Sequence, residues 1–468
     1  MRYRLARVAA AALLILSIAA CGGSSGVDFI WLRAIHTMPD SPSLRVSFEN
    51  YVFRRDVAYG AATQEGGESL LKSAGSTARL TAEYFQPGGT LGGTLLTLDV
   101  PLEKDATSTV IFAGSFDDPQ TITIVSPRLE RPLAALHVQF AHAALEFGAV
   151  DIYVTAPDTE LTATAPLVTI QPGGYSDILE IPFGETRIRL TPAGLLDVLM
   201  DSGELDFPEA DTATGPGMQW LFTVSPSVLA GPSPLFLIGS TGRQTFRFLD
   251  AGTPASLRAV HALPDTPPVD VLIASDTPIT LLTELEYGAR SPVLAAPLGA
   301  VPLGFRQSGE GGELIATREE TLSAGDEVTA FLIGPAEEAA VLTNISSSRS
   351  VVNEAKIRFA NLAPDSKFFS VHLTGSADEA PAAANRVLRD LRFGASSSYV
   401  ARAPGNYFLV VTERFFETQS EAADAEETIA FGPTPLELVG GDVFTWMFFA
   451  PQNEGEPEAL EVFDDRLP

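Results

Sequence analysis

The sequence predicts an all-β protein built from four similar antiparallel β-sandwich domains in tandem. One observation is a motif of the form Arg-x-x-His-x-x-Pro-Asp that recurs along the 468 residues. A second is that a strand with a period of two and one apolar face begins four residues after each copy. A third is that short apolar strands and turn residues recur between the motifs with little helical periodicity. This pattern is typical of antiparallel sandwiches of about seven strands.

The motif occurs in three well-kept copies and one eroded copy. Asparagine replaces histidine in the last copy, and the eroded second copy has Gln139, Leu145 and Glu146 in place of Arg, Pro and Asp. Self-similarity of this kind indicates repeated domains, which we place at residues 31–131, 132–252, 253–351 and 352–468. The histidine positions are His36, His142, His261 and Asn361, and the aspartates of the motif are Asp40, Asp265 and Asp365.

Each copy contains further matching segments. An alternating strand with three apolar positions follows the motif, an aromatic-Gly pair comes next in three copies, and a strongly apolar strand lies near the end. We expect these strands to lie on a core. The apolar positions are Leu44, Val46 and Phe48; Val150, Ile152 and Val154; Val269, Val271 and Ile273; and Phe369, Val371 and Leu373. The aromatic residues are Tyr59, Tyr287 and Phe393, and the apolar strands lie at 110–112, 220–222, 331–333 and 446–449.

The first twenty residues predict an export signal peptide. Three arginines precede an apolar run at residues 8–20 that is too short to span a bilayer as a permanent helix. The run ends Ile18-Ala19-Ala20-Cys21, which resembles the bacterial lipobox, where the cysteine receives a diacylglyceryl group and becomes the mature first residue. An ordinary signal peptide with an incidental cysteine is the alternative. We expect Cys21 to carry the lipid, residues 21–30 to form a tether, and the lipid to hold the protein on a membrane.

The composition argues against several classes of function. The formal net charge of −29 repels phosphate backbones, so we expect no nucleic-acid partner. Cys21 is the single cysteine, so once it is lipidated neither a disulfide nor a cysteine-ligated metal can stabilise the chain. Hydrophobic residues make up 45% of the sequence, which is enough for several separate cores. We expect no cofactor and no metal.

The motif histidine is the first candidate for a functional site, but the fourth copy replaces it with Asn361. Asparagine can copy the hydrogen bonds of a neutral imidazole, whereas it cannot shuttle a proton near neutral pH or serve well as a transition-metal ligand. We therefore interpret His36, His142, His261 and Asn361 as side chains that tie down the Pro-Asp turn.

The other polar motif residues also favour a structural interpretation. Asp40, Asp265 and Asp365 would complete the turn by accepting backbone N–H bonds two residues onward. The motif arginines would form charge pairs or cover apolar surface with their stems, with ligand binding as the alternative. These arginines are Arg33, Arg258 and Arg358.

Enzyme signatures are missing from the sequence. The five histidines form no His-Glu-x-x-His pair, and there is no Gly-x-Ser-x-Gly elbow. We interpret adjacent carboxylates as solvated loops, while weak calcium binding between domains stays open. The aromatic strands at 220–222 and 446–449 are interpreted as buried strands, with sugar stacking as the alternative. We therefore expect no catalytic residues and no metal ligands.

The third copy carries a resemblance to a known family. Its Arg258-x-x-His261-x-x-Pro264-Asp265 motif, the strand beginning at Val269 and the Tyr-Gly-Ala that begins at Tyr287 look like the repeat of domain-of-unknown-function family 4397. That family is a module of bacterial surface proteins and lipoproteins. The first and fourth copies resemble it well and the second poorly. The resemblance implies an immunoglobulin-like sandwich and an extracytoplasmic location, and it supplies no catalytic residues.

These features predict a lipid-anchored cell-envelope protein that acts without chemistry. It would display surfaces for an extracellular or periplasmic protein or glycan, or space them from the membrane. Gly22 after the cysteine is similar to Gram-negative sorting signals that lead to the outer membrane. We expect function in loops that differ between copies, at 201–218, 376–386 and 417–427. A self-associating structural protein and a polysaccharide- or peptide-acting hydrolase are the alternatives.

Overall fold

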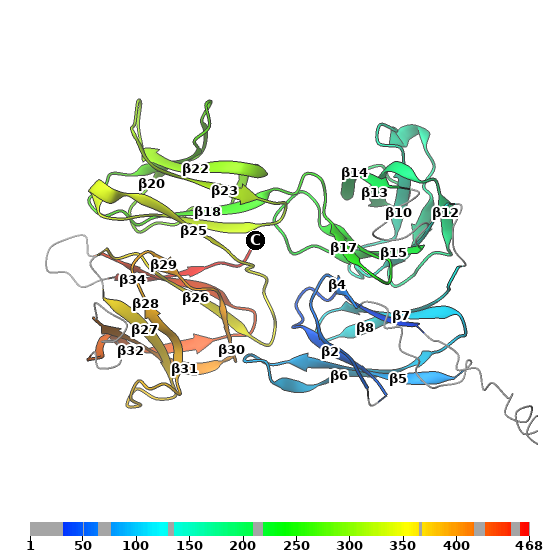
Figure 1. Ribbon diagram of the computed structural model, residues 1–468, viewed down its shortest axis with the longest axis horizontal. Coiled ribbons are helices and arrows are strands. Elements are labelled where there is room, and N and C mark those ends of the chain that lie inside the picture. The colour runs from blue at the N-terminus through cyan, green and yellow to red at the C-terminus, as the bar shows by residue number, and fades with distance from the viewer. Residues whose placement is uncertain are drawn as a thin grey trace, which may run out of the picture.

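The computed structural model describes residues 31–49, 51–63, 76–129, 135–208, 219–364, 367–415, 426–450 and 459–467. Within these residues the secondary structure is β-strand, apart from two short 3-10 turns at Leu161–Ala163 and Ala336–Glu338. The strands form four β-sandwiches in tandem, so the predicted fold class is confirmed. Figure 1 shows them as four compact bodies.

The strands of the first two repeats follow the order expected from the sequence, with eight and nine described strands against the seven expected. Repeat 1 contains β1 (Trp31–His36), β2 (Leu44–Phe48), β3 (Tyr51–Val57), β4 (Ala61–Ala62), β5 (Thr77–Phe85), β6 (Leu91–Pro101), β7 (Ala106–Gly114) and β8 (Pro119–Pro127). Repeat 2 contains β9 (Leu136–His142), β10 (Val150–Thr155), β11 (Val168–Ile170), β12 (Leu179–Ile181), β13 (Gly184–Pro192), β14 (Met200–Phe207), β15 (Gln219–Pro226), β16 (Leu235–Ser240) and β17 (Thr245–Phe248).

The last two repeats are built in the same way. Repeat 3 contains β18 (Ala255–His261), β19 (Val269–Ile273), β20 (Ile279–Leu285), β21 (Leu294–Ala296), β22 (Gly299–Gln307), β23 (Leu314–Leu322), β24 (Glu327–Ile333) and β25 (Ala340–Ile345). Repeat 4 contains β26 (Ala355–Asn361), β27 (Phe368–Thr374), β28 (Arg386–Leu391), β29 (Ala395–Ser396), β30 (Val400–Arg402), β31 (Gly405–Arg414), β32 (Thr428–Leu438), β33 (Val443–Phe449) and β34 (Ala459–Asp464).

All four sandwiches share one strand order. In repeat 1 the sheets are β4-β1-β7-β8 and β3-β2-β5-β6, and the corresponding strands of repeats 2, 3 and 4 pair in the same way. The first strand pairs in parallel with the apolar strand near the end, as β1 does with β7 from Trp31↔Thr107 to His36↔Phe112. This pair differs from the antiparallel pairing expected throughout. It arises because the motif turn carries the chain into the opposite sheet, so the first strand cannot form a hairpin with the second.

The same turn separates this strand order from the constant-type immunoglobulin arrangement. There the first two strands lie side by side in one sheet. Here β1 and β2 lie in opposite sheets, and so do β9 and β10, β18 and β19, and β26 and β27. The sandwich itself is as predicted, with a different order of strands.

Each repeat has its own hydrophobic core between its two sheets. The alternating strands supply it as predicted, because their apolar positions are buried in all four copies, with Val154 partly buried at the edge. Trp220 and Trp446 lie in the cores of repeats 2 and 4, which confirms that the aromatic strands are buried. Each repeat therefore has the core that a sandwich of this size requires.

The sheets that contain the motif strands are covered on both faces. Side chains on the outer face of β1 and β7 pack against those of β9, β15 and β16 in a second type of core, which includes Ile35, Ile111, Leu221 and Phe236. Repeats 3 and 4 form the equivalent core with Val260, Phe331, Ala360 and Met447. Strands such as β24 therefore alternate between two cores and are buried along their whole length.

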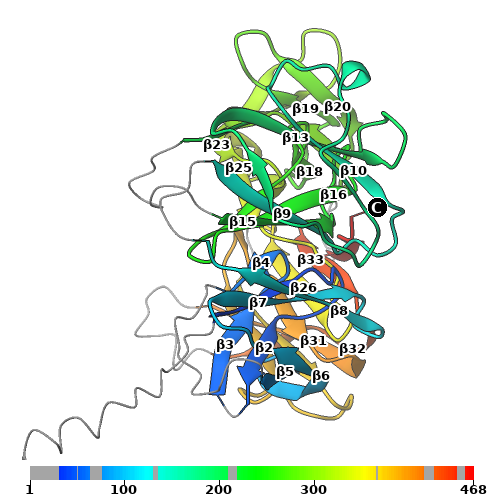
Figure 2. The same ribbon diagram turned by 90° about the vertical axis from the view of Figure 1, so that its right-hand side faces the viewer.

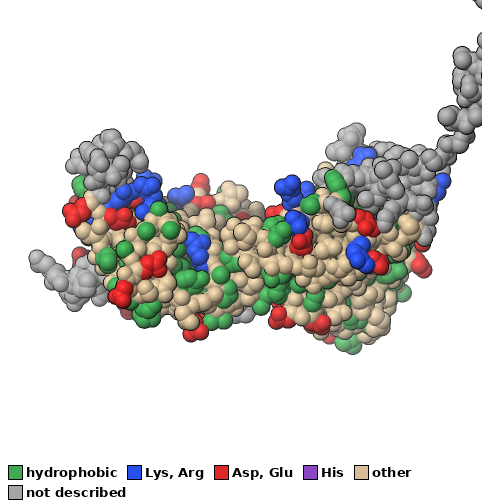
Figure 3. Space-filling view, turned by 90° about the horizontal axis from the view of Figure 1, so that it is seen from below, with side chains coloured by type: hydrophobic (Ala, Val, Ile, Leu, Met, Phe, Trp, Pro, Cys, Tyr) green, Lys and Arg blue, Asp and Glu red, His purple; other side chains and the backbone are tan. Residues whose placement is uncertain are grey.

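The two pairs of repeats close into one block (Figures 1 and 2). Leu229 of repeat 2 lies against Gly325 of repeat 3, where an added Cβ would stand 2.7 Å from Leu229 Cδ1. The connection from repeat 3 to repeat 4 returns to repeat 1, since Val352 N donates to Asp40 O at 2.9 Å and Asn353 Nδ2 to Phe85 O at 2.9 Å. The first and last repeats are therefore neighbours. Seen from below, acidic, basic and hydrophobic side chains are interspersed over the surface (Figure 3).

Candidate functional site

The motif histidines are buried at the ends of the first strands. His36 Nδ1 accepts a hydrogen bond from Met38 N at 3.3 Å, and its Nε2 donates to Pro42 O at 3.1 Å. His261 makes the same pair of bonds to Leu263 N and Pro267 O. A ring that accepts at one nitrogen and donates at the other is a neutral imidazole. Burial lowers the pKa of His36 to about 3, and it also lowers the pKa of His142 and of His261.

The two remaining copies show what the position requires. His142 Nε2 donates to Gly148 O at 2.9 Å, while its Nδ1 has no partner among the described residues. Asn361 Oδ1 accepts from Ala363 N at 3.3 Å, and its Nδ2 donates to Lys367 O at 3.4 Å and Leu391 O at 3.1 Å. The amide thus reproduces both imidazole bonds across the turn. The position is arranged for hydrogen bonding and not for proton transfer.

The motif aspartates do not make the bonds expected of them. Asp40 accepts from the backbone N–H of Phe116, at 3.0 and 3.2 Å, and not from a residue two positions onward. Asp265 makes no side-chain hydrogen bond among the described residues, and its backbone is left-handed with φ 56°. Aspartate tolerates a left-handed backbone better than most residues, which explains the presence of Asp265 in a turn after proline. Asp365 lies outside the described residues.

The motif arginines lie between the repeats. Arg33 Nε donates to Thr109 Oγ1 at 3.0 Å within repeat 1, and its Nη1 reaches Ser240 Oγ of repeat 2 at 3.2 Å. Arg358 repeats this arrangement in repeat 4, with Nε on Thr445 Oγ1 at 2.8 Å and Nη1 on Ser346 Oγ at 3.0 Å. The arginines therefore join neighbouring repeats, which their spacing in the sequence did not indicate.

A buried carboxylate organises the interface between repeats 3 and 4. Asp465, just after β34, is fully buried and accepts from Arg290 Nη1 at 2.5 Å, Tyr399 Oη at 2.7 Å and Arg358 Nη2 at 3.4 Å. Arg258 Nη2 donates to the Asp465 carbonyl oxygen at 2.8 Å. Burial lowers the pKa of Arg290 and raises the pKa of Tyr399. The interpretation of adjacent carboxylates as solvated loops is therefore wrong for Asp465, which follows Asp464 directly.

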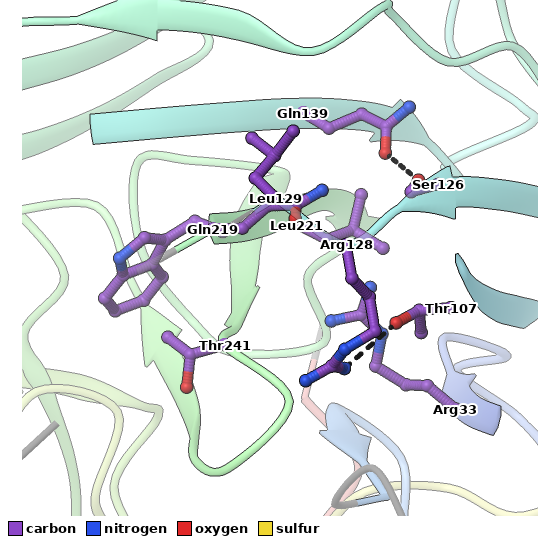
Figure 4. Close-up of a pocket in the computed structure, with 10 residues that line it drawn as sticks. Arg33, Thr107, Ser126, Arg128, Leu129, Gln139, Gln219, Leu221 and Thr241 are labelled. Atoms are coloured by element: carbon purple, nitrogen blue, oxygen red, sulfur yellow. Dashed lines mark hydrogen bonds between the residues drawn. The ribbon is translucent and has the colours of Figure 1, made fainter. Parts of the chain in front are cut away.

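The corresponding place between repeats 1 and 2 holds a small polar cavity of about 40 Å³ (Figure 4). Ser126 lines this cavity and follows two residues after Ile124, the strand partner of Thr109. Asp465 has the equivalent position in repeat 4, two residues after Phe463, the strand partner of Thr445. Ser126 Oγ donates to Gln139 Oε1 of repeat 2 at 2.5 Å. A polar cavity of this size has room for a few water molecules. The interface between repeats 1 and 2 thus has Ser126 with a cavity beside it, where the interface between repeats 3 and 4 has Asp465.

A larger cavity of about 350 Å³ lies where segments of all four repeats meet. Its walls come from the motif turn of repeat 1, the β15–β16 loop of repeat 2, the connection after repeat 3 and the residues after β34. The lining residues are Pro39, Asp40, Ser227, Val228, Leu229, Ser348, Arg349, Ser350, Arg466 and Leu467.

The three loops that were expected to carry function differ in how the structure describes them. Of residues 376–386, all but Arg386, which begins β28, form a loop between β27 and β28. Glu379 and Asn385 hold this loop by accepting from Gly375 N at 2.7 Å and Ala382 N at 2.9 Å. The expectation of a long connection at 201–218 is wrong in its first half, because residues up to Phe207 form β14. Most of 417–427 and Cys21 lie outside the described residues.

In the described part of the chain, no three His, Cys, Asp or Glu side chains are grouped so that they could hold a metal ion. Likewise, no helix in it has the length and apolar character needed to cross a bilayer.

Comparison with known proteins gives one family match. The model of the family described as "Domain of unknown function (DUF4397)" matches residues 255–372, which cover repeat 3 and the first strands of repeat 4. No curated protein matches the chain. A solved structure described as the "Product complex of a multi-modular glycogen-degrading pneumococcal virulence factor SpuA" is similar at 8% identity over 62% of this chain, with a TM-score of 0.16. The chain spans 38% of that protein's length.

Proposed function

We propose that this chain is a non-catalytic protein of the bacterial cell envelope that binds an extracytoplasmic protein or glycan. In this proposal a lipid on Cys21 holds it on a membrane, the outer membrane in a Gram-negative cell. The observation that carries the proposal is that the histidines, the asparagine and the arginines of the motif are buried in turns and between repeats. Because these side chains hold the block together, binding is left to the loops that differ between repeats.

The closed arrangement of the repeats supports binding over spacing. A spacer gains reach when its domains follow one another in a line, whereas here the connection after repeat 3 contacts repeat 1. Buried cores join both pairs of repeats, so the loops are carried on a rigid support. A rigid support lowers the entropy lost when a loop binds.

The loop at 376–386 is the surface we favour for a partner. Glu379 and Asn385 order it internally, and Asn385 Oδ1 accepts from Nδ1 of the buried His372 at 3.0 Å. The loop therefore has a defined shape on the outer sheet of repeat 4, as a recognition loop requires.

A pull-down tests the binding proposal. The chain from Gly22 onward, immobilised and exposed to envelope extracts and to a glycan array, should retain a defined partner. Replacing residues 376–384 with a short Gly-Ser turn should abolish this retention, whereas the same replacement of the hairpin tip at 308–312 should not. If the first replacement leaves retention unchanged, the binding surface lies elsewhere on the protein. If no partner is retained and the chain self-associates in light scattering, the alternative of a structural protein is favoured.

The anchor needs a separate test. Cells expressing the full chain should incorporate labelled palmitate into the protein, and Cys21→Ser should remove both the label and the membrane association. Protease treatment of intact cells then distinguishes a surface-facing protein from a periplasm-facing one. A Cys21→Ser protein that stays in the membrane fraction would contradict lipid anchoring.

A further inference from the structure

The cavity at the meeting point of the four repeats has the dimensions of a small-molecule site. Cavities of roughly 300 to 1,000 Å³ at domain junctions commonly bind small ligands, and this one measures about 350 Å³. Its walls are assembled from four separate segments, so the site exists only when the block is closed.

Arg349 brings hydrogen-bond donors to this cavity. Its Nη1 donates to Pro39 O at 2.8 Å and Ser41 O at 2.9 Å, and the guanidinium lies 5.3 Å from the centre of the Tyr59 ring. Among the described residues, Nε and Nη2 have no acceptor and no carboxylate lies within ion-pair distance. These contacts fix the position of the guanidinium and leave its other N–H groups available to a ligand.

The other charged groups of the cavity are already engaged. Asp40 accepts from Phe116 N, outside the cavity lining. Arg466 Nε lies 3.0 and 2.9 Å from the two carboxylate oxygens of Asp464, and its Nη1 lies 3.9 Å from Asp442. Arg466 is therefore paired with carboxylates, whereas Arg349 is a cation of the lining that has no carboxylate partner among the described residues.

The rest of the wall is largely apolar. Val228 and Leu229 come from the loop between β15 and β16, and Leu467 comes from the segment after β34. We propose that this cavity binds a small organic monocarboxylate, with its carboxylate on Arg349 and its apolar body against Val228, Leu229 and Leu467. A guanidinium and a carboxylate match in plane and charge.

Phosphate fits the same cavity less well. It is a strongly hydrated dianion that takes several cationic partners, whereas here Arg466 is already paired with Asp464 and Asp442, and Asp40 also lines the cavity. A monocarboxylate needs one cation and gains from the apolar wall. The inference goes beyond the proposed partner binding, because it concerns a different surface and a different class of ligand.

Calorimetry with benzoate tests the inference on the chain from Gly22 onward. Benzoate should bind with one-site saturation, while benzyl alcohol, which lacks the charge, and inorganic phosphate, which lacks the apolar body, should each bind at least roughly tenfold more weakly. Because the proposed ligand contacts come from repeats 2, 3 and 4, saturating benzoate should also raise the unfolding midpoint.

Two variants change the site in different ways. Arg349→Lys keeps the charge and loses the planar donor edge, and it should weaken benzoate by roughly tenfold. Val228→Trp fills the cavity while leaving Arg349 in place, and it should abolish binding. Leu314→Trp, at an exposed position on β23, is the matched control and should bind as the parent does.

The outcomes separate cleanly. Absence of saturable benzoate binding in the folded parent would overturn the inference, and so would benzoate binding that Val228→Trp leaves unchanged. Phosphate binding as tight as benzoate would remove the assigned ligand class. None of these results affects retention of a macromolecular partner by the loop at 376–386, so failure here is distinguishable from failure of the proposed function.

Discussion

The buried carboxylate of Asp465 accepts a hydrogen bond from Nη1 of Arg290 at 2.5 Å, which links the end of the fourth repeat to the third. The side chain of Asp465 is fully buried and that of Arg290 is 16% exposed. Arg358 and Tyr399 of repeat 4 bind the same carboxylate. One acidic side chain thus neutralises arginines from two domains, and its loss should be felt in both.

Replacing Asp465 with Asn tests this network. The substitution keeps the size of the side chain and leaves Arg290 and Arg358 buried without a counter-charge, so it should lower the free energy of unfolding by about 3 kcal/mol. Urea unfolding followed by fluorescence measures the change. Asp464→Asn is the control, since its carboxylate pairs with the half-exposed Arg466 and should contribute less than about 1 kcal/mol. Equal effects of the two substitutions would contradict the central role of Asp465.

Substitutions at His261 test the hydrogen-bonding role of the motif position. His261→Asn should unfold within about 0.5 kcal/mol of the parent, because Asn361 makes equivalent bonds in repeat 4. His261→Ala removes both bonds and leaves a cavity, and it should cost about 2 to 3 kcal/mol. Both are measured by chemical unfolding at neutral pH. A large loss in the Asn variant would show that the imidazole has a role of its own.

The depressed pKa of His36 predicts a loss of stability in acid. Its pKa is about 3 in the folded protein against 6.5 in the unfolded chain, so below pH 6.5 the unfolded state takes up a proton that the folded state does not. The stabilisation is therefore complete above pH 6.5 and is lost as the pH falls toward 3. At about pH 5 the loss should be about 2 kcal/mol. His36→Asn should remove this part of the pH dependence, and a pH profile of the unfolding free energy that is identical in both proteins would contradict the assignment.

Replacing Phe331 tests whether the core between repeats 3 and 4 holds these two repeats together. It points away from the core of its own repeat and is fully buried against repeat 4, so Phe331→Ala should cost about 3 to 4 kcal/mol. Val462→Ala, at a half-exposed position on β34, should cost less than about 0.5 kcal/mol. Urea midpoints compare the two. If Phe331→Ala were as mild as its control, the two repeats would not be held together through this face.

The alternating strands could be predicted because their pattern depends on local geometry. Val269, Val271 and Ile273 lie on one face of a strand whichever neighbours it has, and all three are buried. The hydrogen-bonding role of the motif position could also be inferred, since Asn361 in the fourth copy restricts what that position can do. The bonds of the aspartates could not be, because the partner of Asp40 is Phe116, which follows 76 residues later.

The partners of the motif arginines show the same limit. Arg33 reaches Ser240 of another domain, 207 residues along the chain. A signal was present in the strands themselves, since residues 330–333 of β24 are apolar on both faces, and such strands are covered on both sides. That pattern indicates a second contact surface without saying what covers it.

The sequence by itself determined that this protein is a series of β-sandwiches with matching strands, because side-chain alternation and turn residues act over a few positions. Only the tertiary structure decided that the repeats pair through their motif strands, that Asp465 lies at the centre of one such pair, and that four segments enclose a cavity beside Arg349. The physical reason is that these arrangements depend on the surfaces that distant segments present to one another, and no local pattern records which surfaces will meet.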